Sequence, residues 1–420
     1  MLIPSGARHG TVPARASKSH AHRLLILAAL GTRECFVDLG GAYSRDTDAT
    51  ATCLSALGAQ ITRENGGYRV YPLAGEPHNK CVLDCGESGA SLRFILPLCG
   101  ALGAQAAIRP RGRLGARPIA ALEKTLTAHG MEIRHENGVI HTSGRLTPGE
   151  YTLDAGVSSQ YVSALLMTLP RLDGDSTLCV TGETCSAGYI ELTERVLRDA
   201  GLSFKKDKRV YTLPGGQRPV LARQVYAEGD WSGAAACLCM GAFDPRGVTV
   251  TGLDALSAQP DRAVITHLRR FGAAVDVSTR GVTVKAGAYL RGADIDAAPA
   301  PDLVPVLAAL ASCAEGETRI YNAARLRQKE SDRLAATACL INSLGGRVEE
   351  REDELVILGV PELPGGAASS ANDHRIAMAT AVCACKSADN IELDNADCVA
   401  KSYADFWSDF DRLEPGGERV

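Results

Sequence analysis

The sequence lacks any apolar run long enough to cross a membrane, and its first ten residues lack the apolar core of a secretory signal. It also lacks a strong excess of either charge, because 45 lysines and arginines oppose 49 aspartates and glutamates in 420 residues, giving a formal net charge of −4. Such a weak overall field does not attract nucleic acids or membrane surfaces. We therefore expect a cytoplasmic protein that binds neither, in which any anion site is built locally.

Metal-ligand patterns are missing as well. The 14 cysteines contain no C-x-x-C pair, and the histidines form no H-E-x-x-H pattern. In a protein without a secretory signal, such cysteines are expected to be reduced and mostly buried rather than joined in disulfides. We expect no metal site.

The chain is too long for one ordinary core, and two domains are the first expectation. A short pattern, exemplified by "CLSALGAQI" and "VLRDAGLSF", is typical of a helix that ends at a glycine and is followed by a strand. Its glycines recur at intervals of about 71 to 73 residues. They are Gly58, Gly130, Gly201, Gly272 and Gly345.

Apolar helix starts recur with nearly the same period. They lie at Ser19, Gly89, Ser158, Trp231, Asp302 and Asp373. The recurring glycines and the recurring helix starts together predict an α/β protein of six βαβαββ-type repeats of about 71 residues, arranged as two pseudo-threefold domains. The predicted domains are residues 14–228, and residues 1–13 together with 229–420. Because the last repeat runs out of chain near Gly416, residues 1–12 are the candidates to complete its strands.

Polar residues that packing does not require gather at these helix starts. Ser17 or Ser19 can cap the first helix, but Lys18 and Arg23 are cations at the positive end of a helix dipole, where an anion is needed to favour them. Equivalent helix starts carry further polar and charged residues, so the set predicts a polyanionic ligand. This set includes Arg93, Arg117, Ser158, Ser159, Gln160, Ser186, Tyr189, Asp302, Lys329, Glu330, Arg333, Asp373, His374, Arg375 and Lys401.

Each feature also has an ordinary explanation. The stretch "KESDR" could be an ion-paired helix face, and "NDHR" and "SSQ" could be simple helix caps. Asp302 could be a first-turn acid that complements the helix dipole. The recurrence of all these features at one phase of the repeat favours the binding interpretation.

Taken together, the motifs resemble the enolpyruvyl transferases, and most specifically the branch that uses shikimate 3-phosphate as acceptor. The resemblance spans nearly the whole chain through "SKSHAHR", "GESGASLRF", "RLGARPI", "VSSQYVSALLM", "EGDWSGAAA", "PDLVPVLAAL", "RQKESDRL", "NDHRIAMA" and "CVAKSYADFW". It implies two domains, each an inside-out α/β barrel of three units, with the active site in the interdomain cleft. It also implies a monomer without metal or organic cofactor, placed in the shikimate pathway to chorismate and aromatic amino acids.

The resemblance assigns the binding residues of both substrates. It implies that shikimate 3-phosphate is held by Lys18, Ser19, Arg23, Ser158, Ser159, Gln160, Ser186, Asp302 and Lys329. It implies that phosphoenolpyruvate is held by Lys18, Gly89, Arg117, Gln160, Arg333, Arg375 and Lys401. Two phosphates and two carboxylates need several cations, which this set supplies.

The implied reaction transfers the enolpyruvyl group of phosphoenolpyruvate to the 5-hydroxyl of shikimate 3-phosphate and releases phosphate. We expect Asp302 to take the hydroxyl proton, Glu330 to protonate the methylene carbon, and Lys18 to assist proton transfer and charge stabilisation. A Glu330 carboxylate beside cations tends to stay ionised. Its role as an acid therefore requires a raised pKa or reprotonation by a lysine, and the sequence leaves both open.

Three short stretches depart from the family pattern. Arg15 and Ala16 replace a frequent Pro-Gly pair, Ala187 and Gly188 replace a Lys-Pro pair, and "ESGAS" around Gly89 replaces Asn-Ala-Gly-Thr. The sister enzymes that act on UDP-N-acetylglucosamine carry a reactive cysteine where this chain has Gly112, which favours the shikimate branch. An inactive paralogue that acts as a scaffold is the other alternative, but it predicts loss of Asp302, Glu330 and Lys18, all of which are present.

Overall fold

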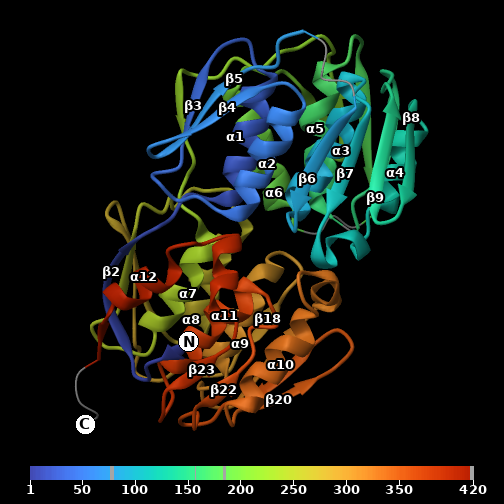
Figure 1. Ribbon diagram of the computed structural model, residues 1–420. Helices are drawn as coiled ribbons and strands as arrows, with labels where there is room; N and C mark the ends of the chain where they lie inside the picture. Colours follow the sequence, from blue (N-terminus) through green and yellow to red (C-terminus); the bar gives the residue numbers. More distant parts are fainter. Residues whose placement is uncertain (76–79, 157, 183–185, 417–420) are drawn as a thin grey trace. The chain divides into compact units, whose positions relative to one another are not determined.

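The computed structural model describes residues 1–75, 80–156, 158–182 and 186–416, which form two compact units (Figure 1). Unit 1 comprises residues 1–17 and 228–420, and unit 2 comprises residues 18–227. Unit 2 begins at Lys18 rather than at residue 14, because residues 14–17 are bonded to unit 1. Ala14 N–H donates to Thr251 O at 2.8 Å, and Ser17 N–H donates to Glu228 O at 2.7 Å.

Three central helices form the core of each unit. In unit 2 they are α1 (Lys18–Leu30), α3 (Gly89–Leu102) and α5 (Ser159–Thr168), and in unit 1 they are α7 (Trp231–Gly241), α9 (Val304–Ala311) and α11 (His374–Ala384). Within each unit the three helices contact one another. Nearly all of their residues are buried, as expected for helices that are apolar on every side.

A second row of helices carries the remaining repeat elements. These are α2 (Arg45–Ala56), α4 (Ala120–Thr127), α6 (Gly188–Asp199), α8 (Val264–Arg270), α10 (Arg333–Ser343) and α12 (Phe406–Arg412). Short 3-10 turns also occur, as η1 (Gly112–Ala116), η2 (Leu169–Arg171), η3 (Pro260–Ala263), η4 (Pro301–Leu303), η5 (Ala324–Gln328) and η6 (Ala396–Lys401).

The sheets of unit 2 repeat one strand order, in which a parallel pair is followed by two antiparallel strands. The first sheet is β14 (Gln224–Tyr226), β3 (Cys35–Asp38), β5 (Gly67–Tyr71) and β4 (Gln60–Glu64). The second is β6 (Cys81–Gly86), β7 (Ala106–Pro110), β9 (Val139–Gly144) and β8 (Met131–Glu136), and the third is β10 (Glu150–Asp154), β11 (Ser176–Thr181), β13 (Val210–Leu213) and β12 (Lys205–Asp207).

The sheets of unit 1 also combine a parallel pair with antiparallel strands, but two of them include strands from the two ends of the chain and differ in strand number. One sheet is β16 (Ala274–Ser278), β17 (Gly281–Lys285), β15 (Val248–Thr251), β2 (Arg8–Pro13) and β24 (Glu414–Pro415). The next is β18 (Asp294–Asp296), β19 (Glu317–Tyr321), β21 (Leu355–Leu358) and β20 (Arg347–Glu350), and the last is β1 (Leu2–Ile3), β23 (Ile391–Leu393) and β22 (Gly366–Ala368).

The N-terminal residues complete two sheets of unit 1. As predicted for residues 1–12, strand β1 completes the last repeat, where it pairs antiparallel with β23. Strand β2 instead pairs parallel with β15 and completes the sheet of the fourth repeat, a role that the sequence did not predict. In Figure 1 the dark blue β2 accordingly lies among the yellow and red elements of unit 1.

The predicted glycines end the second-row helices. Gly58, Gly130, Gly201, Gly272 and Gly345 all have φ between 73° and 117°. A residue with a Cβ is disfavoured in this left-handed region, and helices commonly end on a glycine there. Strand β4, β8, β12, β16 or β20 follows each glycine, so the predicted helix, glycine and strand order is confirmed.

Candidate functional site

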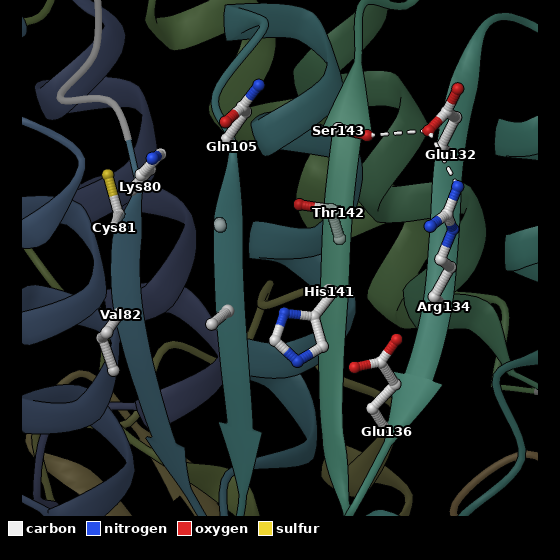
Figure 2. A pocket seen from close by; sticks show the side chains of 12 residues that line it. Lys80, Cys81, Val82, Gln105, Glu132, Arg134, Glu136, His141, Thr142 and Ser143 are labelled. Carbon is white, nitrogen blue, oxygen red and sulfur yellow. Dashed lines mark hydrogen bonds and ion pairs between the residues drawn. The ribbon is translucent and has the colours of Figure 1, made fainter.

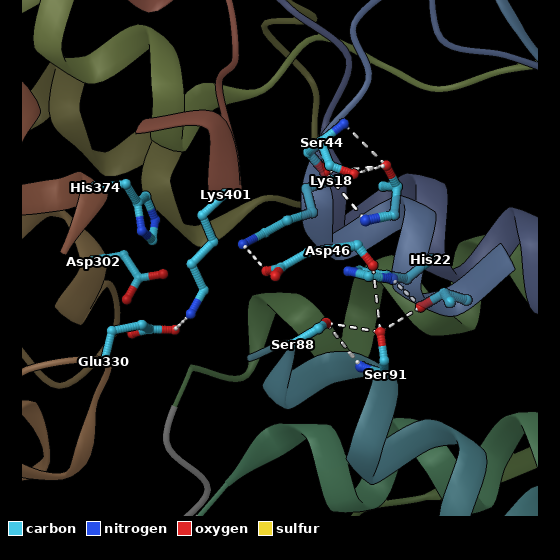
Figure 3. A network of polar contacts seen from close by, with 12 residues as sticks. Lys18, His22, Ser44, Asp46, Ser88, Ser91, Asp302, Glu330, His374 and Lys401 are labelled. Atoms are coloured by element: carbon cyan, nitrogen blue, oxygen red, sulfur yellow. Dashed lines mark hydrogen bonds and ion pairs between the residues drawn. The ribbon is translucent and has the colours of Figure 1, made fainter. Parts of the chain in front are cut away.

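The predicted site residues form one polar cluster in each unit, at the starts of the central and second-row helices. In unit 2, Lys18 opens α1 and lies beside α2. Its Nζ contacts Asp46 Oδ2 at 2.7 Å, and both side chains are largely buried (Figure 3). The ammonium is thus held in place by a carboxylate from the next helix and still lies at a helix N-terminus, where an anion is favoured.

Hydroxyl groups connect the helix starts behind Lys18. His22 Nδ1 lies 2.7 Å from Thr50 Oγ1, and Thr50 Oγ1 lies 2.7 Å from Ser91 Oγ. Ser91 Oγ donates to Ser88 Oγ at 2.7 Å, next to Gly89 (Figure 3). Burial, together with Lys18 and Arg23, lowers the pKa of His22 well below its usual value, so this imidazole is neutral. The network therefore connects the helix starts and adds no positive charge beside Lys18.

Arg23 is buried and is fully engaged by its own unit. Its Nε donates to Thr193 Oγ1 at 2.7 Å, Nη1 to Ser19 O at 2.6 Å, and Nη2 to Ser163 Oγ at 3.1 Å. Nη2 also donates to Tyr189 O at 3.0 Å. Arg23 therefore adds positive charge behind the start of α1 and fixes the α6 segment that contains Tyr189.

Gly89 lies where arginine side chains converge at the start of α3. A Cβ at this position would lie 2.8 Å from Arg117 Nη1 and 3.0 Å from Arg93 Nη1. Arg93 Nη1 also donates to Gln160 Oε1 at 2.7 Å, which fixes the amide that is predicted to bind both substrates. Gly89, Arg117 and Gln160 are therefore brought together, with Arg93 between them.

Replacement of Gly89 by alanine is expected to displace Arg117, because the new methyl group would occupy the space of its guanidinium. We expect Gly89→Ala to raise the KM for phosphoenolpyruvate by about 10-fold, as for a weakened charged hydrogen bond, with a smaller effect on the KM for shikimate 3-phosphate. Steady-state kinetics with each substrate varied in turn measures this. Gly115→Ala is the matched control, because its nearest new neighbour is Pro110 Cγ at 3.7 Å. Equal effects of the two variants would contradict the prediction.

Serines occupy the start of α5 and the segment before α6. Ser158 and Ser159 are buried, and Ser158 Oγ accepts a hydrogen bond from Gln160 N–H at 3.2 Å, so Ser158 does cap the helix. Ser186 is buried with φ of 54°. This uncommon conformation for a residue other than glycine is typical of functional segments.

In unit 1, Asp302 is the centre of a cluster of cations. Its Oδ1 accepts hydrogen bonds from Lys329 Nζ at 3.2 Å and from Arg333 Nη1 at 2.8 Å. Arg375 Nη2 lies 3.8 Å from Oδ2. Burial raises the pKa of Asp302, but these three positive charges outweigh it and hold the pKa well below the usual value. Asp302 is therefore ionised in neutral solution and can accept a proton.

Arg333 binds two further carboxylates. Its Nε lies 2.8 Å from Asp373 Oδ2, and its Nη2 lies 2.8 Å from Glu330 Oε2. Lys401 Nζ lies 3.8 Å from Glu330 Oε1 (Figure 3). The structure thus brings together all the predicted residues of unit 1, with four cations surrounding three carboxylates.

The ordinary explanation of "KESDR" as an ion-paired helix face is wrong. Helix α10 begins at Arg333, and Asp332 caps it by accepting a hydrogen bond from Ala335 N–H. Lys329 and Glu330 precede the helix, so the helical spacing does not fix the directions of their side chains. Lys329 contacts Asp302, and Glu330 contacts Arg333. Asp373 does cap α11, and the same carboxylate also binds Arg333.

Asp46 and Thr193 are candidate site residues that the sequence analysis did not assign. Asp46 was hidden because an acid in the first turn of α2 is explained by the helix dipole alone. Thr193 lies within α6, and its contact with Arg23 spans 170 residues of sequence. The weak signal for Asp46 was its place in a second-row helix start, the phase at which other polar residues recur.

A hollow of about 420 Å³ lies on the sheet β6-β7-β9-β8 and contains none of the predicted site residues (Figure 2). Its lining includes Lys80, His141 and Glu136, together with Glu132 and Arg134, whose carboxylate and guanidinium lie 3.7 Å apart. These are exposed side chains of an outer sheet face, with acids and bases interspersed. It does not present the concentrated positive charge that two phosphorylated substrates require.

Within the described ranges, no helix is long and apolar enough to cross a membrane, and no group of three or more His, Cys, Asp or Glu side chains is arranged to hold a metal ion. Most cysteines in this part of the chain are buried, as expected.

The family model for EPSP synthase (3-phosphoshikimate 1-carboxyvinyltransferase) matches residues 4–410. The chain belongs to the EPSP synthase family. The 3-phosphoshikimate 1-carboxyvinyltransferase of Clostridium beijerinckii is 36% identical over 426 residues, covering 98% of this chain and 97% of that protein. The enzyme of the same name from Clostridium kluyveri is 36% identical over 411 residues, covering 97% and 95%.

Solved structures show the same architecture. EPSP synthase from Acinetobacter baumannii superimposes with a TM-score of 0.82 at 25% identity, covering 99% of this chain and 98% of that one. The enolpyruvyl transferase NikO from Streptomyces tendae has a TM-score of 0.76 at 20% identity, which is a likeness of fold. These findings confirm the family, the α/β fold class and the enzyme class predicted from the sequence of this EPSP synthase family member.

Proposed function

We propose that the chain transfers the enolpyruvyl group of phosphoenolpyruvate to the 5-hydroxyl of shikimate 3-phosphate, with Asp302 as base and Glu330 as proton donor. The main observation in support of this assignment is that Asp302 and Glu330 contact the same arginine. Arg333 donates to Asp302 Oδ1 and to Glu330 Oε2, each at 2.8 Å, so one guanidinium sets the position of both carboxylates. This shared partner supports the assignment of proton removal and proton delivery to neighbouring carboxylates.

The two proton transfers divide the reaction into steps. Asp302 takes the proton of the 5-hydroxyl as its oxygen attacks C2 of phosphoenolpyruvate, while the methylene carbon receives a proton from Glu330. The resulting tetrahedral adduct then loses phosphate while the Glu330 carboxylate takes a proton back from the methyl group, which restores the double bond. Arg333, Arg375 and Lys401 stabilise the charge on the phosphate and carboxylate.

Unit 2 supplies the remaining groups that the reaction needs. Arg117 and Lys18 add cations for phosphoenolpyruvate, and Gly89 leaves space for the Arg117 guanidinium. Hydroxyl and amide groups hold the phosphate and ring hydroxyls of shikimate 3-phosphate, with Arg23 adding charge behind them. These groups are Ser19, Ser158, Ser159, Gln160 and Ser186, and Lys329 of unit 1 completes the set. Both units are therefore required for turnover, and we propose a cytoplasmic monomer as the active form.

Gly112 supports shikimate 3-phosphate as the acceptor. This position, where the UDP-N-acetylglucosamine enzymes carry a reactive cysteine, has φ of 53°, and a Cβ there would lie 2.5 Å from Glu87 Oε1. A thiol at this place is therefore disfavoured by both the backbone and its neighbour. Phosphate release from phosphoenolpyruvate, measured separately with shikimate 3-phosphate and with UDP-N-acetylglucosamine, tests the proposal. Release with neither acceptor would favour the scaffold alternative.

Substitution of Arg117 by lysine is expected to weaken phosphoenolpyruvate binding selectively, because an ammonium cannot form the paired hydrogen bonds of a guanidinium. We expect Arg117→Lys to raise the KM for phosphoenolpyruvate by about 10-fold or more, and the KM for shikimate 3-phosphate by much less. Initial rates over a grid of both substrate concentrations measure the two constants. Arg113→Lys is the control and should leave both unchanged, because Arg113 is an exposed arginine in η1, the short turn that ends just before Arg117. Parallel increases in both constants for Arg117→Lys would remove it from the phosphoenolpyruvate set.

A further inference from the structure

Three carboxylates contact the guanidinium of Arg333 before any ligand binds. Nε and Nη2 contact the two oxygens of Asp373 at 2.8 and 3.2 Å. Nη2 also contacts Glu330 Oε2, and Nη1 contacts Asp302 Oδ1, both at 2.8 Å. Both donors of Nη2 thus face carboxylates, so a substrate anion that binds this nitrogen must compete with Glu330 or Asp373.

The three carboxylates differ in how firmly they are held. Asp302 is 26% exposed, but its Oδ1 accepts hydrogen bonds from both Lys329 and Arg333. Asp373 is completely buried, and it also accepts hydrogen bonds from Ser331 Oγ at 3.0 Å and Arg375 N–H at 2.9 Å. The Glu330 side chain is 12% exposed, and its second partner, Lys401, lies at the longer distance of 3.8 Å. Asp373 thus anchors Arg333, whereas Glu330 is held at the accessible edge by the two cations that are assigned to the incoming substrate.

We propose that phosphoenolpyruvate displaces Glu330 from Arg333 and Lys401, and that Glu330 takes up a proton from solvent as a result. The proposal rests on the proposed function, since it requires that these two cations bind phosphoenolpyruvate. The charged groups that face Glu330 in the described part of unit 1 include Arg333, Lys401 and Asp302. When the substrate anion binds the two cations, Glu330 keeps Asp302, another acid, as a neighbour.

Elementary electrostatics gives the direction of this change. Cations within about 4 to 6 Å favour an ionised carboxylate, and anions at the same distance favour the protonated acid. Before binding, Arg333 and Lys401 favour the ionised form of Glu330; after binding, Glu330 lies beside a phosphate and a carboxylate, which favour the protonated form. Binding of phosphoenolpyruvate therefore causes protonation of the residue that will donate a proton to it. In this way a glutamate that lies among cations in the free protein can act as an acid.

The proton balance closes over one turnover. Glu330 gains one proton from water when the substrate binds, and gives it to the methylene carbon as the new C–O bond forms. Asp302 takes one proton from the attacking hydroxyl and returns it to the released phosphate or to solvent. As the adduct loses phosphate, Glu330 takes one proton back from the methyl group, which restores the double bond, and it releases this proton to solvent when it rebinds Arg333.

Proton uptake on binding tests this inference without relying on turnover. The probe is phosphoglycolate, which carries a carboxylate and a phosphate but has no methylene carbon to protonate. It is titrated into protein saturated with shikimate 3-phosphate, between pH 5.5 and 7.5, by calorimetry in two buffers of different ionisation enthalpy. We expect the wild type to take up about one proton more per site than Glu330→Gln near pH 6. The ionisation of the probe itself cancels in this difference.

Glu350→Gln is the matched control, because Glu350 pairs with Arg327 outside the cluster at 2.6 Å. It should keep the full wild-type uptake. If phosphoglycolate binds but the wild type and Glu330→Gln take up the same number of protons, the inference is overturned while the proposed function stands. If phosphoglycolate binds and Arg333→Lys does not weaken it, the assignment of Arg333 fails, and with it the proposed function of this cluster. A direct readout in the wild type is the infrared band of a protonated carboxyl group, which should appear on binding and be absent in Glu330→Gln.

Discussion

Asp302→Asn is expected to lower kcat by about 10²-fold to 10⁴-fold, the usual range for loss of a general base. The amide keeps an oxygen that can accept from Lys329 and Arg333, so the cluster keeps its shape, but it cannot take the proton of the 5-hydroxyl. Binding of shikimate 3-phosphate should change by less than about 10-fold. Single-turnover rates together with the dissociation constant from calorimetry separate these two effects.

The control for this variant is Asp332→Asn, which makes the same chemical change three residues from Lys329. Asp332 caps α10, and asparagine caps a helix about as well as aspartate does. Its kcat should remain close to that of the wild type. A wild-type kcat for Asp302→Asn would remove Asp302 from the mechanism, and an equal loss in both variants would indicate a structural effect.

The pH dependence of Asp302 adds a second readout. Its pKa is held well below the usual value by Lys329, Arg333 and Arg375, which outweigh the effect of burial. The stabilisation that its ionised form gives to the fold is therefore complete above the unfolded pKa of about 3.9 and is lost as the pH falls through the lower pKa of the folded state. A loss of kcat/KM between pH 5 and 7 cannot come from Asp302 in the free enzyme, and must arise from another group.

The sequence predicted the repeating parts of this fold because they depend on local chemistry. A glycine at positive φ ends a helix wherever it occurs, so Gly58 and its counterparts marked the period without any knowledge of packing. The sequence could not show in the same way that β1 and β2 join two different sheets of unit 1. It depends on which sheet edge lies beside the N-terminal residues, and that is a property of the folded unit.

The candidate site shows the same division. Lys18 and Arg23 stood out because cations at helix starts are locally unfavourable, so each needed an explanation beyond its own helix. Asp46, the partner of Lys18, is favourable where it is, as a first-turn acid, and so gave only a weak signal of a second role. Sequence reasoning thus finds residues that conflict with local rules and misses those that satisfy a local rule and a distant contact together.

The pair formed by Arg333 and Asp373 gives the largest expected effect on stability. Both side chains are almost completely buried, with exposures of 2% and 0%. Arg333→Met would leave the Asp373 carboxylate without its cation, and breaking a buried pair in this way costs about 3 to 5 kcal/mol in the free energy of unfolding. Chemical denaturation followed by circular dichroism measures this loss, provided that the slope of the transition is unchanged.

A second substitution distinguishes the unpaired charge from lost packing. In the Arg333→Met background, Asp373→Asn removes the uncompensated carboxylate while asparagine still caps α11, so the double variant should recover about 1 to 3 kcal/mol relative to Arg333→Met. Arg327→Met is the control on the first change, because Arg327 is 29% exposed and pairs with Asp332 and Glu350 at 3.1 and 2.6 Å. Loss of such accessible pairs costs about 1 kcal/mol or less. A double variant less stable than Arg333→Met would mean that Asp373 stabilises the unit through its cap and Ser331 alone, and that Arg333 is not anchored by charge.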